Sequence, residues 1–268
     1  MSLLSVSSLS AAYGSTSILK DISFAADSGT IVGILGENAS GKTTLFKSIA
    51  GILPHSGSCE LNGRRIEGLS ARQIARLCSY IPQRSGISIE ISALDVVLMG
   101  FNPRLRLLEQ PGPAMIERAR KTLASIGLGG LEEKNYLSLS EGQKQLCILA
   151  RTLVSDAALL LLDEPESALD FRYRHRMLQI LRQWIDEGER CAVVSLHDPM
   201  LALNSCDRIL LLHGGTIAGE IHPGADDLQE IEEKLSMFYG CVSLHRLNDR
   251  SGNSRFAMLM EEAKPWNP

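Results

Sequence analysis

The sequence predicts an α/β protein with a mainly parallel β-sheet. Three short and almost continuous apolar runs, at 30–35, 157–162 and 191–196, have the composition of strands buried on both faces. Segments with helical periodicity, such as 172–184, alternate with these runs. Strands that alternate with helices favour a parallel sheet, because parallel neighbours need a crossover connection. The 268 residues are enough to bury a full hydrophobic core.

The N-terminal segment predicts a separate antiparallel sheet. Residues 3–9 and 18–24 alternate apolar and polar side chains, as strands with one solvated face do. A third strand is expected at 58–61, and the Asn62-Gly63 dipeptide after it favours a tight turn. We therefore expect an N-terminal antiparallel β-subdomain beside the parallel sheet.

Residues from about 85 to 140 predict a helical subdomain inserted into the α/β core. Two helical segments, 92–100 and 113–127, are separated by breaks rich in proline and glycine, and no strong strand signal occurs there. The other expected elements are a helix after Lys42, a helix at 70–79, a short strand at 79–81, a helix around 146–153 and a hairpin over 208–220.

The chain is expected to divide into one domain and an extension. Residues 1–224 form the domain, which includes the helical insertion. Residues 225–268 form a C-terminal extension that packs on the core or trails from it, with an acidic helix at 226–239, a candidate strand pair and a polar tail.

The composition excludes several classes of protein. A net charge of −4 and a pI near 5.9 argue against a nucleic-acid-binding surface. Six cysteines occur without a C-x-x-C pair, which indicates reduced thiols rather than metal ligands or disulfides. No signal peptide is recognisable, and no apolar run approaches the ~20 residues of a membrane-spanning helix. We expect a chain that does not cross a bilayer by itself.

The segment after the first buried strand fits the phosphate-binding pattern G-x-x-x-x-G-K-[ST]. Its residues are Gly36, Glu37, Asn38, Ala39, Ser40, Gly41, Lys42 and Thr43, followed by Thr44. Backbone N–H groups of such a loop wrap nucleotide phosphates, while Lys42 would bind the β- and γ-phosphates and Thr43 would bind Mg²⁺. An ordinary Gly-Lys turn would not need a strand before it and a helix after it.

Polar residues also follow the other two buried strands. Ligands gather at the carboxyl ends of parallel strands, so these residues should share one edge of the sheet with the phosphate loop. Asp163 has the position of a carboxylate that holds Mg²⁺ through water, and Glu164 that of a general base for the attacking water. His197, after the third strand, is placed to sense the γ-phosphate. A plain helix cap at Asp163-Glu164 and a structural histidine are the alternatives.

A second phosphate-binding element is expected at the start of a helix far downstream. The segment is Leu139-Ser140-Glu141-Gly142-Gln143. Ser140 and Gln143 have the spacing of a capping box, so the plain interpretation is a helix N-cap. The exposed N–H groups and the helix dipole can also face a phosphate. Two copies placed head to tail would let the phosphate loop of each meet Ser140 of the other.

With these residues identified, the chain resembles the ATP-binding cassette (ABC) ATPases, the nucleotide-binding subunits of ABC transporters, from Leu3 to about Pro223. The markers occur in the family's order, including Gln83 in the position of the Q-loop. The resemblance implies a RecA-like P-loop NTPase core, ATP and Mg²⁺ as cofactors, and a homodimer. Tyr13 would stack on adenine. A turn tyrosine and a solvated loop glutamine are the alternatives for these two residues.

The resemblance also implies a role for each marker. Catalysis would involve Glu164, His197 and Gln83, and Mg²⁺ would be bound by Thr43, Gln83 and Asp163. The signature residues Leu139, Ser140, Gly142 and Gln143 would contact ATP held by the partner copy. Ser167-Ala168-Leu169-Asp170 corresponds to the D-loop, with Ser167 and Asp170 as its polar residues.

Three residues depart from the family's pattern. Ala39 replaces a glycine in the phosphate loop, Glu166 stands where a small polar residue is common, and Glu141 replaces the first glycine of the signature. A carboxylate within ~4 Å of a phosphate would cost about 4 kcal/mol per unit charge at an effective dielectric constant of 20. Glu141 should therefore point away from the nucleotide, and the helix dipole favours its charge there.

Two segments, 92–103 and 196–208, resemble cassettes that serve iron-siderophore, haem and cobalamin importers. The resemblance implies two integral-membrane permease subunits, an extracytoplasmic substrate-binding protein and a location on the cytoplasmic face of the cell membrane. An iron-siderophore or related metal chelate is the first expectation for the cargo. The alternatives are haem, cobalamin or molybdate import, or a two-component exporter. An ABC protein of the DNA-repair type would need long heptad arms between the phosphate loop and the signature, and residues 85–137 are too short for them. An ABC protein of the translation type would carry two cassettes in one chain, and only one is present here.

Overall fold

The computed structural model describes residues 2–83, 86–167 and 169–261. Its centre is a six-stranded sheet with the order β10-β9-β3-β8-β7-β6. All neighbouring pairs are parallel except β9 with β10, which form an antiparallel edge. The strands are β3 (Ile31–Leu35), β6 (Cys78–Ile81), β7 (Leu159–Asp163), β8 (Cys191–Leu196), β9 (Arg208–His213) and β10 (Thr216–Ile221). The predicted α/β class with a mainly parallel sheet is confirmed.

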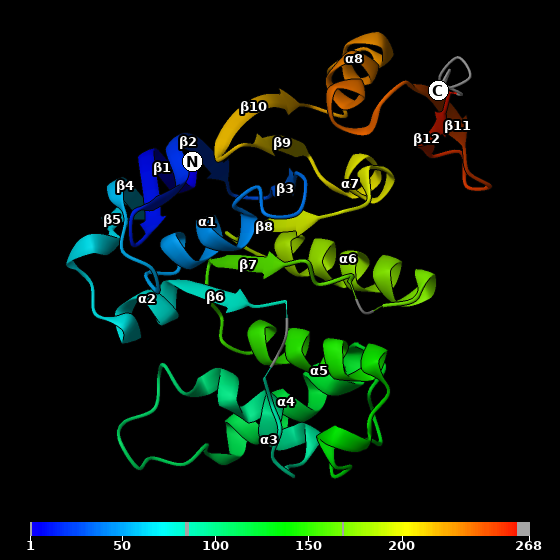
Figure 1. Ribbon diagram of the computed structural model, residues 1–268. Helices are drawn as coiled ribbons and strands as arrows, with labels where there is room; N and C mark the ends of the chain where they lie inside the picture. The colour runs from blue at the N-terminus through cyan, green and yellow to red at the C-terminus, as the bar shows by residue number, and fades with distance from the viewer. Residues whose placement is uncertain (1, 84–85, 168, 262–268) are drawn as a thin grey trace.

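An antiparallel sheet of four strands, in the order β2-β1-β4-β5, precedes and flanks this core (Figure 1). Its strands are β1 (Ser2–Tyr13), β2 (Thr16–Asp27), β4 (Ser56–Leu61) and β5 (Arg64–Arg65). Asn62 and Gly63 both adopt positive φ, as a tight hairpin turn requires, so the turn expected there is confirmed. Side chains of this sheet pack on α1 (Lys42–Ile49) and on one face of the parallel sheet.

The helical segments predicted between 85 and 140 are present and pack on one another. They are α3 (Ala93–Leu98), the 3₁₀ turn η2 (Met99–Phe101), α4 (Pro113–Ser125) and the 3₁₀ turn η3 (Tyr136–Ser138). Next comes α5 (Glu141–Leu153), which contacts α3 and α4 as well as α6. Figure 1 shows α3, α4 and α5 as a layer beneath the sheet. We propose that these helices form the inserted subdomain.

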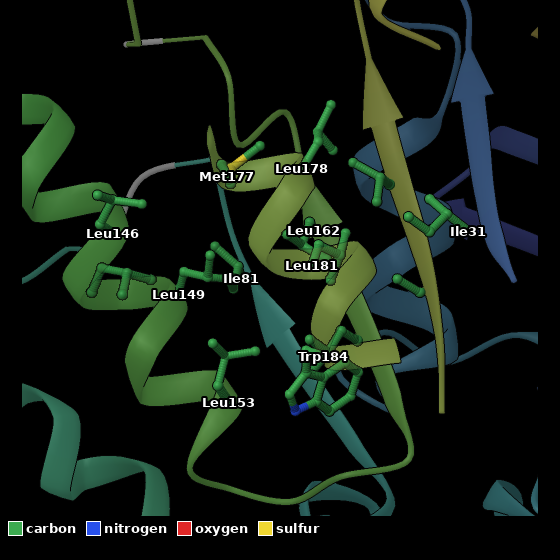
Figure 2. Close-up of a cluster of buried hydrophobic side chains, with 14 of the residues drawn as sticks. Ile31, Ile81, Leu146, Leu149, Leu153, Leu162, Met177, Leu178, Leu181 and Trp184 are labelled. Carbon is green, nitrogen blue, oxygen red and sulfur yellow. The ribbon is translucent and has the colours of Figure 1, made fainter. Parts of the chain in front are cut away.

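The main hydrophobic core lies between the parallel sheet and the helices α5 and α6 (Phe171–Asp186). Figure 2 shows side chains of the sheet, α5 and α6 packing against one another there. The sheet contributes Ile31, Ile81 and Leu162, α5 contributes Leu146, Leu149 and Leu153, and α6 contributes Met177, Leu178, Leu181 and Trp184. This packing fixes the start of α5 relative to the sheet, because α5 has a buried stripe along most of its length.

The C-terminal segment folds back onto the core. It contains α8 (Leu228–Tyr239) and the hairpin of β11 (Val242–Asn248) with β12 (Ser254–Met260). The Asn204 side chain makes two hydrogen bonds to the backbone of Phe256, at 2.9 and 3.1 Å, and so ties β12 to α7 (Pro199–Ser205). We propose that residues 225–268 form an extension, whose described part, 225–261, packs on the 1–224 domain.

Two short helices complete the fold. α2 (Ala71–Leu77) was expected, and the 3₁₀ turn η1 (Ile66–Gly68) precedes it. α7 was not expected, although Asp198 caps it and Pro199 occupies its first turn. The Asp198-Pro199 pair is the local signal that predicts such a helix start. Across the described ranges, no helix has the length and apolar character needed to span a membrane.

Candidate functional site

Three neighbouring strands end at the same edge of the sheet. β8 lies between β3 and β7 and is parallel to both, and its register pairs Leu35 with Leu196 and Asp163 with Ser195. The segments that follow these strands are therefore brought together, although they come from positions far apart in the sequence. The expectation that the phosphate loop, Asp163-Glu164 and His197 share one edge is confirmed.

The loop between β3 and α1 has the geometry of a phosphate cradle. A Cβ on Gly36 would lie 2.4 Å from the Leu212 carbonyl oxygen, so this position requires glycine. Gly41 has φ +109°, and the first turn of α1 carries no side-chain cap, which leaves its N–H groups available to an anion. The hydroxyl of Ser40 is buried without a hydrogen-bond partner among the described residues. These features fit a bound nucleotide phosphate.

Ala39 tolerates the backbone that this loop needs. Its φ is +64°, a left-handed conformation that costs an ordinary L-residue roughly 1–2 kcal/mol. The glycine usual in the family would avoid that cost, so this departure strains the loop without changing its course. Lys42 is buried and donates to the carbonyl oxygens of Gly36, at 2.7 Å, and Glu37, at 3.0 Å.

Glu164 is the centre of a compact polar cluster. Gln83 donates to its Oε2 at 2.6 Å, and Nε2 of His197 lies 2.8 Å from the same oxygen. Lys42 Nζ lies 3.6 Å from the other oxygen, Oε1. The structure thus brings together all three residues predicted to be catalytic, with the loop lysine beside them. Glu164 has φ +48°, and a glutamate holds such a backbone only when its surroundings impose it.

Asp163 is fully buried and held by two hydroxyl groups that sequence reasoning missed. Ser195 donates to its Oδ1 at 3.0 Å, and Tyr80 donates to its Oδ2 at 3.2 Å. Burial and the neighbouring Asp163 raise the pKa of Tyr80 above its ordinary value, so the phenol stays a donor. A signal for Ser195 existed, since it is the one polar residue in the apolar run of β8.

Thr43 and Asp163 fit a magnesium ion shared with nucleotide phosphates. Their oxygens are the hard ligands that Mg²⁺ prefers, and Mg²⁺ commonly takes its other ligands from phosphates and water. Throughout residues 2–83, 86–167 and 169–261, no group of three His, Cys, Asp or Glu side chains forms a metal cage.

The predicted signature segment begins α5 with a capping box. Ser140 Oγ accepts from the N–H of Gln143 at 3.3 Å, and Gln143 Oε1 accepts from the N–H of Ser140 at 3.0 Å. Glu141 points outward and forms an ion pair with Lys144 at 2.8 Å. Leu139 is buried. Within the described chain, no hydrogen bond or ion pair joins residues 139–143 to residues 36–44.

The remaining predicted residues lie near the surface. Tyr13 is 48% exposed at the end of β1, where a planar ligand could reach it. Asp170 caps α6 by accepting from the N–H of Tyr173 at 3.0 Å, and Ser167 is exposed in the preceding turn. Ala168 of the same motif falls outside the described residues.

A cleft of about 220 Å³ borders the first residues of the phosphate loop. The loop residues Gly36, Glu37 and Asn38 line it together with His197, and the far wall is Phe238 and Tyr239 at the end of α8. The sequence held no signal for this contact, because the two segments are about 200 residues apart. The extension therefore reaches the edge of the candidate site.

Gly142 has a packing role beside its place in the signature. A Cβ there would lie 2.8 Å from the Tyr173 ring on α6. We expect Gly142→Ala to lower the free energy of unfolding by about 1–3 kcal/mol, because extra volume in a packed contact forces neighbours apart. Denaturant titration of a double-mutant cycle with Tyr173→Ala checks this. An equal loss in both backgrounds would contradict the assigned contact.

Comparison with known proteins agrees with this geometry. The ABC transporter family profile matches residues 19–167. A hemin import ATP-binding protein, HmuV, of Rhizobium etli is 33% identical over 250 residues, covering 90% of this chain and 91% of the relative. An ATP-binding protein of Helicobacter pylori assigned to iron chelatin transport is 34% identical, covering 78% and 83%.

Solved structures support the same assignment. One chain, from an ABC transporter described as of metal-chelate type in an inward-facing conformation, matches with a TM-score of 0.81 and 25% identity. The match covers 97% of this chain and 99% of that one. The chain therefore belongs to the ABC transporter family, whose ATPase members bind ATP and hydrolyse it to power transport.

Proposed function

We propose that this chain energises an ABC importer of an iron-siderophore or a related metal chelate. The observation that carries the ATPase assignment is the cluster of Gln83, His197 and Lys42 around Glu164 beside a phosphate cradle. The cargo rests on relatives named for hemin import, iron chelatin transport and cobalamin import. The hemin relative from Rhizobium etli, which covers almost the whole chain, supports haem as the second candidate.

We propose different tasks for the two oxygens of Glu164. Oε2 is occupied by Gln83 and His197, which orient the carboxylate. Oε1 faces Lys42, whose ammonium group also contacts carbonyl oxygens of its own loop. When ATP draws Lys42 to its β- and γ-phosphates, Oε1 becomes free to accept the proton of an attacking water. Mg²⁺ held by Thr43, Gln83 and Asp163 would neutralise charge on the phosphates.

We propose that two copies complete each site. The helix start at Ser140 presents N–H groups and a dipole that suit a phosphate, yet among the described residues it makes no hydrogen bond to the loop of its own chain. In a head-to-tail homodimer, Leu139, Ser140, Gly142 and Gln143 of one copy would face ATP on the other. The outward ion pair of Glu141 with Lys144 supports this, because it keeps the carboxylate away from that surface.

The transport assembly follows from the same proposal. The homodimer would lie on the cytoplasmic face of the cell membrane against two integral-membrane permease subunits, with an extracytoplasmic substrate-binding protein delivering the chelate. Gln83 ends the β6 segment where the chain enters the helical layer, and its side chain holds Glu164. This placement supports a role in passing nucleotide state to the permeases.

Glu164→Gln should bind ATP with unchanged affinity and hydrolyse it about 100-fold or more slowly, because an amide cannot accept the proton. Equilibrium ATP binding and steady-state phosphate release measure the two quantities. Glu189→Gln, at an exposed position, is the matched control. Wild-type turnover in Glu164→Gln would remove this residue from the role of base.

Ser140→Ala should lose most of the ATPase activity, whereas Glu141→Gly should retain it. Of these two residues, only Ser140 lies on the side of the helix start that would face a phosphate. Loss of the cap also costs roughly 1 kcal/mol of stability. Ser70→Ala removes the same Ser–Gln capping box from α2 and serves as the stability control. Equal losses of turnover in Ser140→Ala and Glu141→Gly would contradict the proposed orientation.

A further inference from the structure

Glu166 is a buried carboxyl group in the middle of the candidate site. It lies in the turn between β7 and α6, and only 2% of the residue is exposed. Its Oε1 accepts a hydrogen bond of 2.9 Å from the backbone N–H of His197. Its other oxygen, Oε2, is buried and has no hydrogen-bond partner among the described residues. A glutamate is rarely found so deeply buried without a specific contact.

The contact joins two segments that must cooperate. Glu166 belongs to the turn that starts at Glu164 and leads to Asp170, and His197 is the first residue after β8. The backbone of His197 is held by Glu166, while its imidazole lies 2.8 Å from Glu164. The backbone and the imidazole of His197 are therefore each held by a carboxyl group, and the two carboxyl groups lie two residues apart in one turn.

We propose that Glu166 is a positioning residue for ATP hydrolysis, which fixes the backbone of His197 so that the imidazole meets Oε2 of Glu164. The inference rests on the proposed role of Glu164 as general base. Glu166 contacts neither the phosphate loop nor the predicted Mg²⁺ ligands through any described hydrogen bond. It acts through His197, and a misplacement of about 1 Å at a reacting group can cost about 100-fold in rate.

The raised pKa of Glu166 is compatible with this contact. Burial raises the pKa of its carboxyl group, against the lowering effects of the His197 N–H and imidazole, and the nearby charge of Glu164 raises it further. The thiol of Cys206 is a further titratable neighbour, and burial keeps it neutral. A protonated carboxyl group still offers Oε1 to His197, and it avoids burying a second negative charge beside Glu164.

The first test compares two substitutions of similar volume. Glu166→Leu removes the acceptor, and we expect kcat to fall by about tenfold or more while the affinity for ATP stays unchanged. Glu166→Gln keeps an oxygen acceptor and should restore most of the lost rate. Glu67→Leu is the matched control, because Glu67 makes the same kind of contact, to the N–H of Cys59 at 2.8 Å, in the N-terminal sheet.

A second readout follows His197 directly and does not need turnover. The ring Cε1–H signals of the six histidines can be recorded by NMR, and the signal lost in His197→Gln identifies this residue. Glu166→Leu should move that signal, and Glu166→Gln should move it much less. An unmoved signal, or a wild-type kcat in Glu166→Leu, would overturn the proposal. If Glu164→Gln kept full activity while the signal still moved, the role of Glu164 would fail and the positioning contact would stand.

The pH dependence of stability tests the buried acid. Because the pKa of folded Glu166 is raised, the folded protein holds a proton there that the unfolded chain releases once pH exceeds the ordinary glutamic acid value. The wild type therefore loses stability as pH rises from that value to the folded pKa, and Glu166→Gln does not. The Tm of Glu166→Gln relative to the wild type should rise as pH increases above the ordinary glutamic acid value, and it should level off above the raised pKa of folded Glu166. A constant or falling difference would contradict a buried, protonated Glu166.

Discussion

The parallel pairing of β3, β8 and β7 is the constraint on which the rest of the site depends. Because the three strands run in the same direction and lie side by side, their carboxyl ends meet at one edge. The phosphate loop, His197 and the Asp163-Glu164 pair are placed there by the backbone, before any side-chain contact forms. The apolar composition of these strands is therefore a condition for the chemistry as well as for stability.

Side-chain contacts then set the fine geometry at that edge. Glu164 is held by Gln83, which lies between β6 and the helical layer, and by His197, which follows β8 in the core. A shift of the helical layer relative to the sheet would therefore act on the carboxylate through Gln83. Asp163 is held within the core itself, by Ser195 and Tyr80, so its position is independent of such a shift.

The C-terminal extension adds a wall to the site. The end of α8 lines the cleft beside Asn38 and His197, and β12 is tied to α7 through Asn204. α7 begins two residues after His197, so the extension contacts segment 197–204 near both ends. The end of α8 lies by His197, and β12 is bonded to Asn204. Changes in this extension would thus alter the surroundings of His197.

The sequence by itself determined the architecture and most of the site. The signals that predicted them are local: apolar runs, helical spacing, the Gly36–Thr43 pattern and the Ser140–Gln143 capping box. Each depends only on residues close together in the chain, so each can be recognised in the sequence. Tertiary structure alone decided that Gln83 and His197 share one oxygen of Glu164, that Tyr80 and Ser195 hold Asp163, and that Glu166 grips His197. These contacts join residues distant in sequence, and no local pattern records which side chains meet across a sheet edge.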